Sequence, residues 1–276
     1  MIKRILVPLD SSTYTKVAIK YAVLIAKKHD ATITGMTILD VAEIESSMGS
    51  IPLGGIYWAE KLEQSKIEKA KNNWKNIEEY FAKQCVENKV NYTLEEDKGV
   101  PSHWILKKAK FHDLVVMGIR TYYELDSPDK SGDTVKKILS HSEIPMLMVP
   151  DNYVEIKNVV IAFDGSMQAT KAVHGFIHLA RVLSFNIKLV NSTSDEEYAE
   201  FLRANLKKYF EAYGINNVEF IHTEKDIIDI MDSEFYRKND LFVIGSHSKN
   251  AIKEFFIGSL TQYLIDKNDK PIFLGL

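Results

Sequence analysis

The chain has 276 residues and one cysteine, and its 35 Lys and Arg against 38 Asp and Glu give a formal net charge of −3. This length is enough for two domains of roughly 100 to 150 residues, each with its own core. Charges of both signs are interspersed, which argues against nucleic-acid binding through a general basic surface, and a single cysteine cannot form an intrachain disulfide.

The amino-terminal residues 1–8 contain no long apolar core followed by a small-residue cleavage site. Nor is there a run of about 18 or more apolar residues, the length that a membrane-spanning helix needs. We therefore expect a cytoplasmic protein that makes no contact with membranes. The cysteine, Cys85, lies in the helical-looking stretch 77–89, and we expect a buried structural thiol.

The first predicted strand covers residues 3–9 and ends at Asp10, which is followed by the small polar residues Ser11 and Ser12. Apolar residues then recur at helical spacing over 18–26, which predicts an amphipathic helix, and a second strand follows at 32–38. Residues 43–58 contain three glycines and a proline, and they predict a long loop before a helix from about Ala59 to Asn88.

This loop at 43–58 carries several large apolar side chains, so we expect it to cover something. Two interpretations stay open: a cover over the surface of a partner, or a lid over a ligand. The second half of the chain has no counterpart, because residues 191–195 lead almost directly into a helix that begins near Glu196. The apolar residues of the loop are Met48, Ile51, Leu53, Ile56 and Trp58.

The chain contains an internal duplication, in which one structural unit occurs twice. Residues 157–166 match residues 3–12 as an apolar strand that ends in an aspartate, and a helix and a strand at 186–190 follow again. Each half also closes alike, because the proline that leads the last strand comes 27 positions after Gly118 and 26 positions after Gly245. The boundary lies near the short polar segment 150–154, which predicts domains at 1–150 and 151–276 that pack against each other.

Strands that alternate with helices of a dozen or so residues predict an α/β fold. The strands are almost continuously apolar, which is typical of a parallel sheet covered by helices on both faces. We expect the connections between parallel strands to be right-handed crossovers.

A glycine-containing element follows the predicted strand 241–244. It reads Gly245-Ser246-His247-Ser248, then nine residues, then Gly258-Ser259. Small residues and a hydroxyl at the carboxyl end of a strand and the start of a helix lie where open α/β sheets hold phosphates. The first half has a damaged copy of this element, in which Gly118 is followed by Thr121 and then by Gly132-Asp133.

The strands that end at Asp10 and Asp164, together with the glycine elements, resemble those of the universal stress protein family in tandem form. This resemblance covers essentially the entire chain. The resemblance implies two tandem Rossmann-like domains, each an open five-stranded parallel sheet, associated through their last strands. It also implies that members with the pattern Gly-x2-Gly-x9-Gly-Ser/Thr bind ATP or a related adenine nucleotide, with or without Mg. Such members act in stress adaptation without a well-defined turnover.

The second domain is the expected nucleotide site, although Ser248 replaces the second glycine of the family pattern. Asp164 can accept hydrogen bonds from ribose hydroxyls, Ser166 can cap the next helix, and Ser259 is the expected N-cap of the last helix. Gly99-Val100-Pro101-Ser102 resembles the turn that starts the third helix of the family, with Ser102 as its cap. The predicted site comprises Ala162 and Phe163 beside the adenine, with Asp164, Gly165, Ser166, Val190, Gly245, His247, Ser248, Gly258, Ser259 and Leu260.

The first domain is expected to be degenerate and structural. Asp133 would bring a carboxylate to the phosphates, and a like-charge contact at about 4 Å with an effective dielectric near 20 costs on the order of 4 kcal/mol. The alternative is a divalent ion that restores binding, held by Asp10, Asp126, Asp129 and Asp133.

Other signals point away from metal sites and catalysis. His174 and His178 are four residues apart on a predicted helix, but no nearby cysteine or third histidine completes a metal site, so packing histidines are favoured. No phosphate-binding loop of the Gly-x4-Gly-Lys-Ser/Thr type occurs, and no Ser/His/Asp arrangement stands in a motif context. We expect no catalytic residues and, at most, a slow ATPase.

Two function hypotheses follow. In the first, the second domain binds ATP or a relative as a regulatory ligand in a stress response. In the second, neither crevice binds nucleotide and the chain is an interaction scaffold that works through its last strands, 146–149 and 272–274. The apolar character of these strands also predicts a homodimer of tandem chains.

Overall fold

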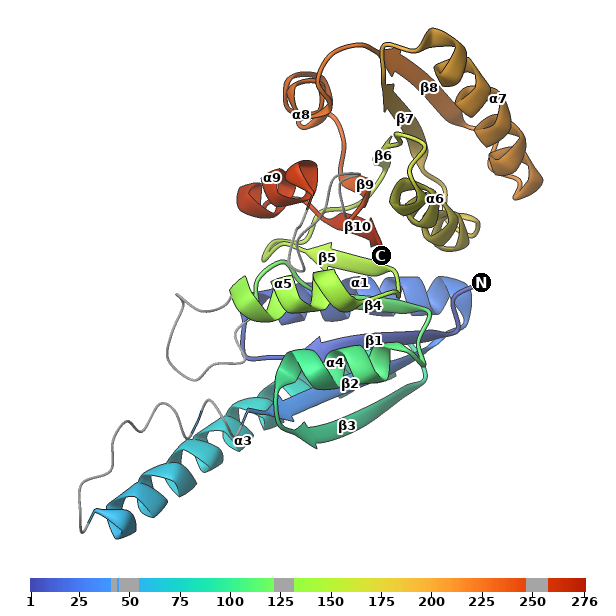
Figure 1. The fold of residues 1–276 in the computed structure, drawn as a ribbon. Coiled ribbons are helices and arrows are strands. Elements are labelled where there is room, and N and C mark those ends of the chain that lie inside the picture. The colour runs from blue at the N-terminus through green and yellow to red at the C-terminus, as the bar shows by residue number, and fades with distance from the viewer. Residues whose placement is uncertain (41–43, 45–54, 122–131, 247–257) are drawn as a thin grey trace.

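The structure is a computed structural model that describes residues 1–40, 44, 55–121, 132–246 and 258–276 (Figure 1). The first half alternates strands and helices in the predicted order. Its elements are β1 (Arg4–Leu9), α1 (Thr13–His29), β2 (Thr32–Leu39), α3 (Ile56–Glu87), β3 (Tyr92–Lys98), α4 (Pro101–Ala109), β4 (Leu114–Gly118), α5 (Gly132–His141) and β5 (Met146–Val149).

The second half repeats this order, with one short α-helix that continues into a π-helical turn. Its elements are β6 (Asn158–Ala162), α6 (Met167–Ala180), β7 (Asn186–Ser192), α7 (Glu196–Ala212), β8 (Val218–Thr223), α8 (Ile227–Ile230), η2 (Met231–Phe235), β9 (Leu241–Gly245), α9 (Ser259–Lys267) and β10 (Ile272–Gly275).

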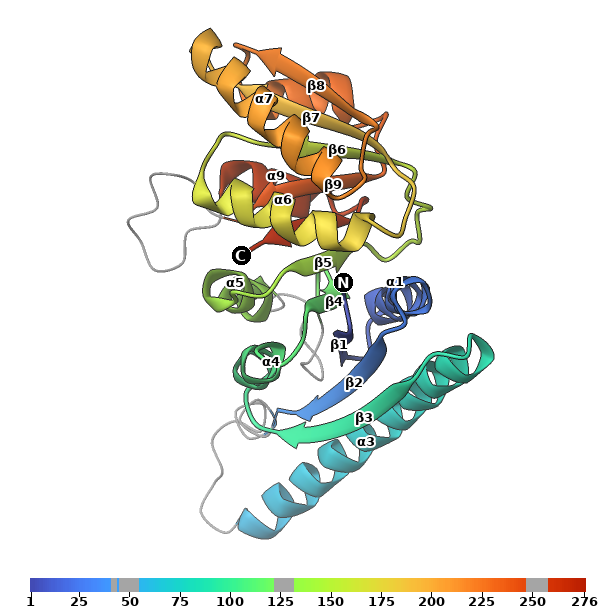
Figure 2. The ribbon, with the colours of Figure 1, turned by 90° about the vertical axis from the view of Figure 1, so that its right-hand side faces the viewer.

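The strands form one sheet in the order β3-β2-β1-β4-β5-β10-β9-β6-β7-β8. In the described part of the chain, the strand pairs within each half are parallel, and only the central pair, β5 with β10, is antiparallel. Each half is therefore an open five-stranded parallel sheet, as predicted, and the two sheets continue into each other at the middle (Figure 2). The exact domain boundary stays a prediction.

The last strands are not available to a partner in the way the scaffold hypothesis assumed. Phe273 of β10 lies opposite Leu147 of β5, and all residues of both strands are buried. Each strand satisfies its open edge against the other within the same chain, which removes the exposed backbone groups that favour association. A homodimer of tandem chains stays a prediction, and it needs another surface.

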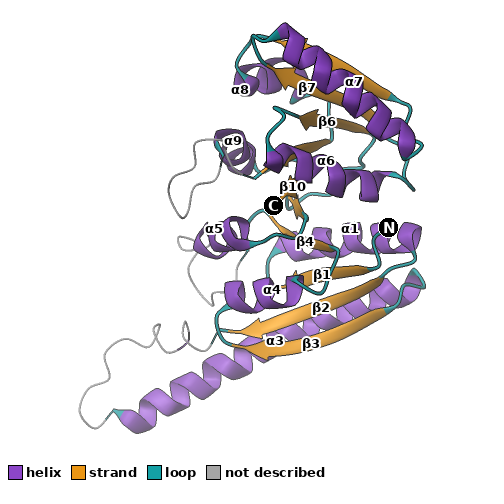
Figure 3. Cartoon of the chain, turned by 45° about the vertical axis from the view of Figure 1, so that its right-hand side comes forward, coloured by secondary structure: helices purple, strands orange, loops and turns teal. Residues whose placement is uncertain are grey.

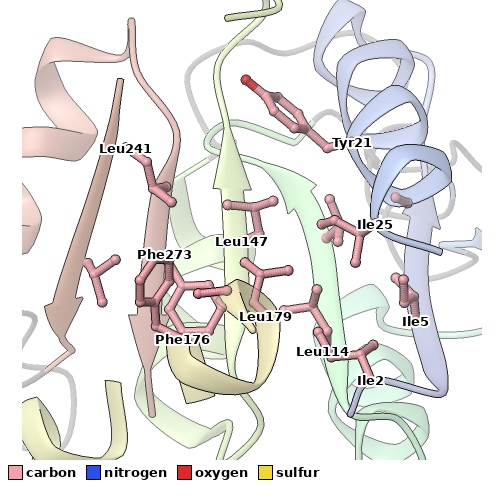
Figure 4. Close-up of a cluster of buried hydrophobic side chains, with 14 of the residues drawn as sticks. Ile2, Ile5, Tyr21, Ile25, Leu114, Leu147, Phe176, Leu179, Leu241 and Phe273 are labelled. Atoms are coloured by element: carbon pink, nitrogen blue, oxygen red, sulfur yellow. The ribbon is translucent and has the colours of Figure 1, made fainter. Parts of the chain in front are cut away.

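Helices cover both faces of the sheet because successive strand residues point to opposite sides. On β1, Ile5 and Val7 belong to a core that also contains side chains of α1, α3, α6 and α7, whereas Leu6 belongs to the core on the other face, which contains side chains of α4, α5, α8 and α9. The first of these cores runs without a break through both halves. Figure 4 shows Leu147 and Phe273 side by side at its centre, where Phe176 from α6 also packs.

Polar contacts join the halves next to this core. The Tyr21 hydroxyl on α1 donates to the carbonyl oxygen of Val154 at 2.5 Å and accepts from the Val154 N–H at 3.2 Å. His29, the last residue of α1, is buried and bonds through Nε2 to the carbonyl oxygen of Leu179 on α6 at 3.1 Å. The predicted packing of the two halves against each other is thus fixed by specific hydrogen bonds as well as by apolar burial.

The structure bears on three local predictions: the start of α3, the cap of α4 and the burial of Cys85. Helix α3, the long helix in Figure 3, begins three residues earlier than predicted, at Ile56. Trp58 lies in its first turn with 70% of its surface exposed. Residues 45–54 of the predicted loop lie outside the described residues. Ser102 does not cap α4, because Val100 is the N-cap and Pro101 occupies the first helical position, which suits its fixed φ and missing N–H. Cys85 is buried as predicted, and burial raises the pKa of its thiol to about 12.

Candidate functional site

A cavity of about 350 Å³ opens at the carboxyl ends of the strands in the second half. This is the edge where parallel α/β sheets bind ligands, and the volume lies within the range of small-molecule sites. The residues that line it are Ala162, Phe163, Asp164, Ser166, Ala169, Ser192, Asp226, Ile227, Ile244, Gly245, Gly258, Ser259, Leu260 and Thr261.

The turn after β6 shapes one wall of this cavity. Gly165 has a φ of +76°, and a side chain there would meet the Tyr198 hydroxyl oxygen at 2.1 Å, so only glycine suits the position. Asp164 is exposed and accepts the Ser166 N–H through Oδ1 at 2.9 Å. Ser166 Oγ in turn accepts the Ala169 N–H at 3.2 Å, which confirms Ser166 as the N-cap of α6.

The glycine at the end of β9 allows strand and helix to approach closely. A Cβ on Gly245 would lie 2.8 Å from the backbone nitrogen of Ala169 and from the backbone of Gln168. A side chain at this position would therefore push α6 away from the sheet and widen the cavity wall.

The start of α9 forms the opposite wall. Gly258 is the N-cap and Ser259 is the first helical residue, so the prediction that Ser259 caps this helix is wrong by one position. Among the residues that the structure describes, no side chain caps the helix, while the Gly258 N–H bonds to the carbonyl oxygen of Ser246 at 3.1 Å. An uncapped helix start carries N–H groups and a partial positive charge, both of which suit an anion.

Eight of the twelve predicted site residues line the cavity. Gly165 lies in the turn behind it, and Val190 is fully buried on the face of the sheet that packs against α8 and α9. His247 and Ser248 lie outside the described residues. The eight are Ala162, Phe163, Asp164, Ser166, Gly245, Gly258, Ser259 and Leu260.

Residues after β7 and β8 also line the cavity, and sequence reasoning missed them. Ser192 Oγ donates to the carbonyl oxygen of Lys225 at 2.6 Å, which holds the end of β7 against the segment after β8. Asp226 caps α8, because its Oδ1 accepts the N–H of Ile228 at 2.8 Å. The available signal was an aspartate directly before an apolar run, which is a helix-start pattern.

The aspartates that end β1 and β6 have different surroundings. Asp10 is only 3% exposed, and its Oδ1 accepts the Ser12 N–H at 3.0 Å and the hydroxyls of Ser12 and Thr15. These hydroxyls enclose the Asp10 carboxylate, whereas Asp164 opens into its cavity. The second half is therefore better prepared to bind a ligand through this position.

The divalent ion considered for the first half would be held by Asp10, Asp126, Asp129 and Asp133. Asp126, Asp129 and the side chain of Asp133 lie outside the described residues. Across the described ranges, no group of three or more His, Cys, Asp or Glu side chains is placed to hold a metal ion.

The histidine pair on α6 packs against aromatic rings of α7. His174 lies 4.7 Å from the ring of Tyr209 and His178 lies 5.9 Å from the ring of Tyr213, measured between ring centroids. Burial also lowers the pKa of His178. These contacts account for both residues as packing groups between two helices.

Sheet order, helix placement and a crevice at the carboxyl edge of the strands define a tandem Rossmann-like α/β protein. Residues 1–150 match the family model described as the universal stress protein family. This match covers more than half of the 276 residues, so the chain belongs to the universal stress protein family. No helix in the described ranges is both long and apolar enough to cross a membrane.

Several known proteins match this chain over nearly its whole length. Universal stress protein Slr1230 from Synechocystis sp. is 24% identical over 295 residues, covering 98% of each chain. A universal stress protein structure from Archaeoglobus fulgidus covers 98% of this chain and 97% of its own, with 16% identity and a TM-score of 0.68. The structure of PA1789 from Pseudomonas aeruginosa, described as a functionally unknown protein, covers 99% of this chain and 92% of its own. Its sequence identity is 13% and its TM-score is 0.61.

Adenine nucleotides occur in solved structures of this family. One universal stress protein is in complex with cAMP, at 16% identity and a TM-score of 0.35 over 55% of this chain. Another, from Arabidopsis thaliana, has AMP bound, at 14% identity and a TM-score of 0.33 over 53% of this chain.

Proposed function

We propose that the second half of the chain binds an adenine nucleotide, ATP or a relative with or without Mg, as a regulatory ligand in a cytoplasmic stress response. The observation that carries this proposal is the pairing of Asp164 with the uncapped start of α9 across one cavity. A carboxylate suits ribose hydroxyls, and a helix start suits phosphate. Family membership supports an adenine nucleotide, because the pattern of nucleotide-binding members is kept here except at Ser248.

Sheet order supports one orientation of the ligand. The carboxyl ends of β9, β6, β7 and β8 follow one another along the same edge, and they carry Gly245, Asp164, Ser192 and Asp226 in that order. With phosphate at α9 and ribose at Asp164, the base extends toward β7 and β8. Its edge then lies near Ser192 and Asp226, with Ala162 and Phe163 bordering its face.

Enclosure of Asp10 supports a structural role for the first half. A carboxylate that already accepts the hydroxyls of Ser12 and Thr15 is a poor acceptor for a ribose. This half contributes β5, which pairs with β10, and α1, whose Tyr21 and His29 contact the second half.

Thermal unfolding with added nucleotide tests the proposal. A ligand at a hundred times its dissociation constant that binds only the folded state raises stability by about 2.7 kcal/mol. ATP, ADP or AMP, with and without magnesium, should raise the melting temperature, and native mass spectrometry of the purified protein should show retained nucleotide. If none of the three shifts the melting temperature, the nucleotide proposal fails.

The alternative function is an interaction scaffold without nucleotide. The exposed aromatic residues Tyr57 and Trp58 at the start of α3 favour it, since large exposed apolar side chains mark association sites. Removing both by Tyr57→Ser and Trp58→Ser should then abolish self-association in analytical ultracentrifugation, while a purely nucleotide-binding protein would keep its oligomeric state.

A further inference from the structure

The ten-stranded sheet ends at β8 on one side, and this edge is open in the described part of the chain. The Thr193 N–H bonds to the Thr223 carbonyl oxygen at 3.0 Å, so Thr223 turns its backbone groups toward β7. Because successive residues of a strand alternate in this respect, Phe220 and His222 turn theirs outward. A strand edge with outward N–H and C=O groups is a template for a further strand.

The opposite edge of the sheet, β3, is protected by charge. Its residues 95–97 are three successive carboxylates, and symmetric antiparallel pairing of two copies centred there would set Glu95 directly opposite Glu95. Strand β8 carries one carboxylate, Glu219. Antiparallel pairing of two β8 strands centred on Ile221 sets Glu219 opposite Thr223, so no like charges oppose each other. The edge at β8 is therefore the one that accepts a second copy of the chain.

Helix α7 flanks this edge with a stripe of charged side chains. Figure 2 shows α7 at the same end of the sheet as β8. Its buried face, which includes Leu202, packs on the sheet, and on one flank Tyr209 meets His174 of α6 at 4.7 Å between ring centroids. The other flank lies over the edge strand, since Arg203 lines one cavity with His222 of β8. On this flank four exposed residues recur at helical spacing, and they are Glu196, Glu200, Arg203 and Lys207.

The stripe complements an antiparallel copy of itself. Along the helix the charges run acidic, acidic, basic, basic, so an antiparallel copy sets Glu196 opposite Lys207 and Glu200 opposite Arg203. A two-fold axis that pairs β8 with β8 also makes the two α7 helices antiparallel. Within one chain Arg203 Nη2 lies 2.7 Å from Glu200 Oε1, and both side chains are well exposed, so this pair can join a network across the axis. Such complementary charges set the orientation of an interface.

We propose that β8 and the α7 stripe form the contact between two copies of this chain, which pair antiparallel through β8 into one continuous sheet. Because β5 and β10 pair within the chain, a homodimer needs a further surface, and this edge supplies it. The contact does not depend on nucleotide binding. It is also distinct from the exposed aromatic residues at the start of α3.

Charge reversal of the stripe tests the proposal, with the oligomeric state of the intact chain measured by sedimentation velocity. The unchanged protein should be a dimer. Glu196→Lys with Glu200→Lys makes the stripe entirely basic, and Arg203→Glu with Lys207→Glu makes it entirely acidic. Each double variant should raise the dissociation constant of the dimer about tenfold or more, because like charges then face each other. An equal mixture of the two variants should form dimers again, since their stripes have opposite charge.

The matched control reverses two charges on the solvent face of the same helix. Glu197 and Lys208 are both exposed and have the same spacing as Glu196 and Lys207, so Glu197→Lys with Lys208→Glu should dimerise like the unchanged protein. A monomeric unchanged protein, dimers that persist in both reversed stripes, or a mixture that stays monomeric would each overturn the proposal. Dimers that are lost in Tyr57→Ser with Trp58→Ser but kept in the stripe variants would assign the contact to α3 and contradict it as well.

Discussion

Thr15 Oγ1 donates a hydrogen bond to Asp10, and Ala169 occupies the position of Thr15 in the second half, five residues after Asp164. The two halves share the strand, the aspartate and a serine at the N-cap position of the next helix. They differ in two hydroxyl groups, because Ser12 Oγ also donates to Asp10, whereas Ser166 Oγ accepts the Ala169 N–H. Asp164 and Ala169 both line the cavity, so the residue at position 169 helps to decide how much of the carboxylate a ligand can use.

Ala169→Thr should therefore weaken nucleotide binding. A threonine here offers Asp164 the same internal donor that Asp10 has, and the competition should raise the dissociation constant for ATP about five- to tenfold. Ala169→Val is the matched control, because valine has the shape of threonine without its hydroxyl. Isothermal titration should find near-normal affinity for the valine variant, and equal weakening in both variants would assign the effect to bulk instead of hydrogen bonding.

We expect Asp226 to recognise the adenine base of ATP through a hydrogen bond to the edge of its ring. In the proposed orientation its carboxylate can accept from the 6-amino group of adenine, whereas inosine carries an oxygen there, so ATP should bind several-fold more tightly than ITP. Asp226→Asn should reduce this preference, because the amide can donate to that oxygen. Asparagine is also a good N-cap, so the melting temperature should stay unchanged. An ATP to ITP ratio that is the same in both proteins would remove Asp226 from base recognition.

Acidification should loosen the contact between the halves through His29. Burial lowers the pKa of this imidazole in the folded chain, so the unfolded chain takes up a proton first as the pH falls below about 6.5. The stability that depends on neutral His29 is therefore present above that pH and is lost on acidification. His29→Gln keeps an N–H donor for the Leu179 carbonyl group and does not titrate.

Chemical denaturation at pH 7.5 and pH 5.5 measures how much stability is lost through protonation of His29. The free energy of unfolding should fall more for the unchanged protein than for His29→Gln. Because His112 and His178 also have lowered pKa values from burial, the variant should keep part of the pH dependence. Identical pH profiles for both proteins would mean that His29 contributes nothing to it.

Periodicity and the internal repeat predicted a parallel α/β fold in two halves and the strand ends of the crevice, while the five strands of each half came from the resemblance to the universal stress protein family. Asp164, Ser166 and Gly245 could be found because each follows directly from a strand end in the repeat. Asp226 could not, since it enters the cavity only because β8 lies beside β7 and its following turn reaches the same edge. The helix start at Ser259 was missed by one position because Gly258 and Ser259 both suit an N-cap.

Pairing of the last strands within the chain also lay beyond the sequence pattern. Met146–Val149 and Ile272–Gly275 read as apolar strands that need neighbours, and nothing in their residues says whether the partner comes from the same chain. The antiparallel contact of Phe273 with Leu147 answers this for one chain. It also explains why the tandem form holds together without a flexible linker.

The asymmetry between the halves is tested most directly by the number of ATP molecules that one chain binds in isothermal titration calorimetry. We expect one per chain, lost in Gly258→Asp and largely kept in Gly258→Asn. Both side chains are good N-caps and fit the φ of −56° at this position, but only aspartate repels phosphate. Two ATP molecules per chain, or one that persists in Gly258→Asp, would contradict a single nucleotide site at the start of α9.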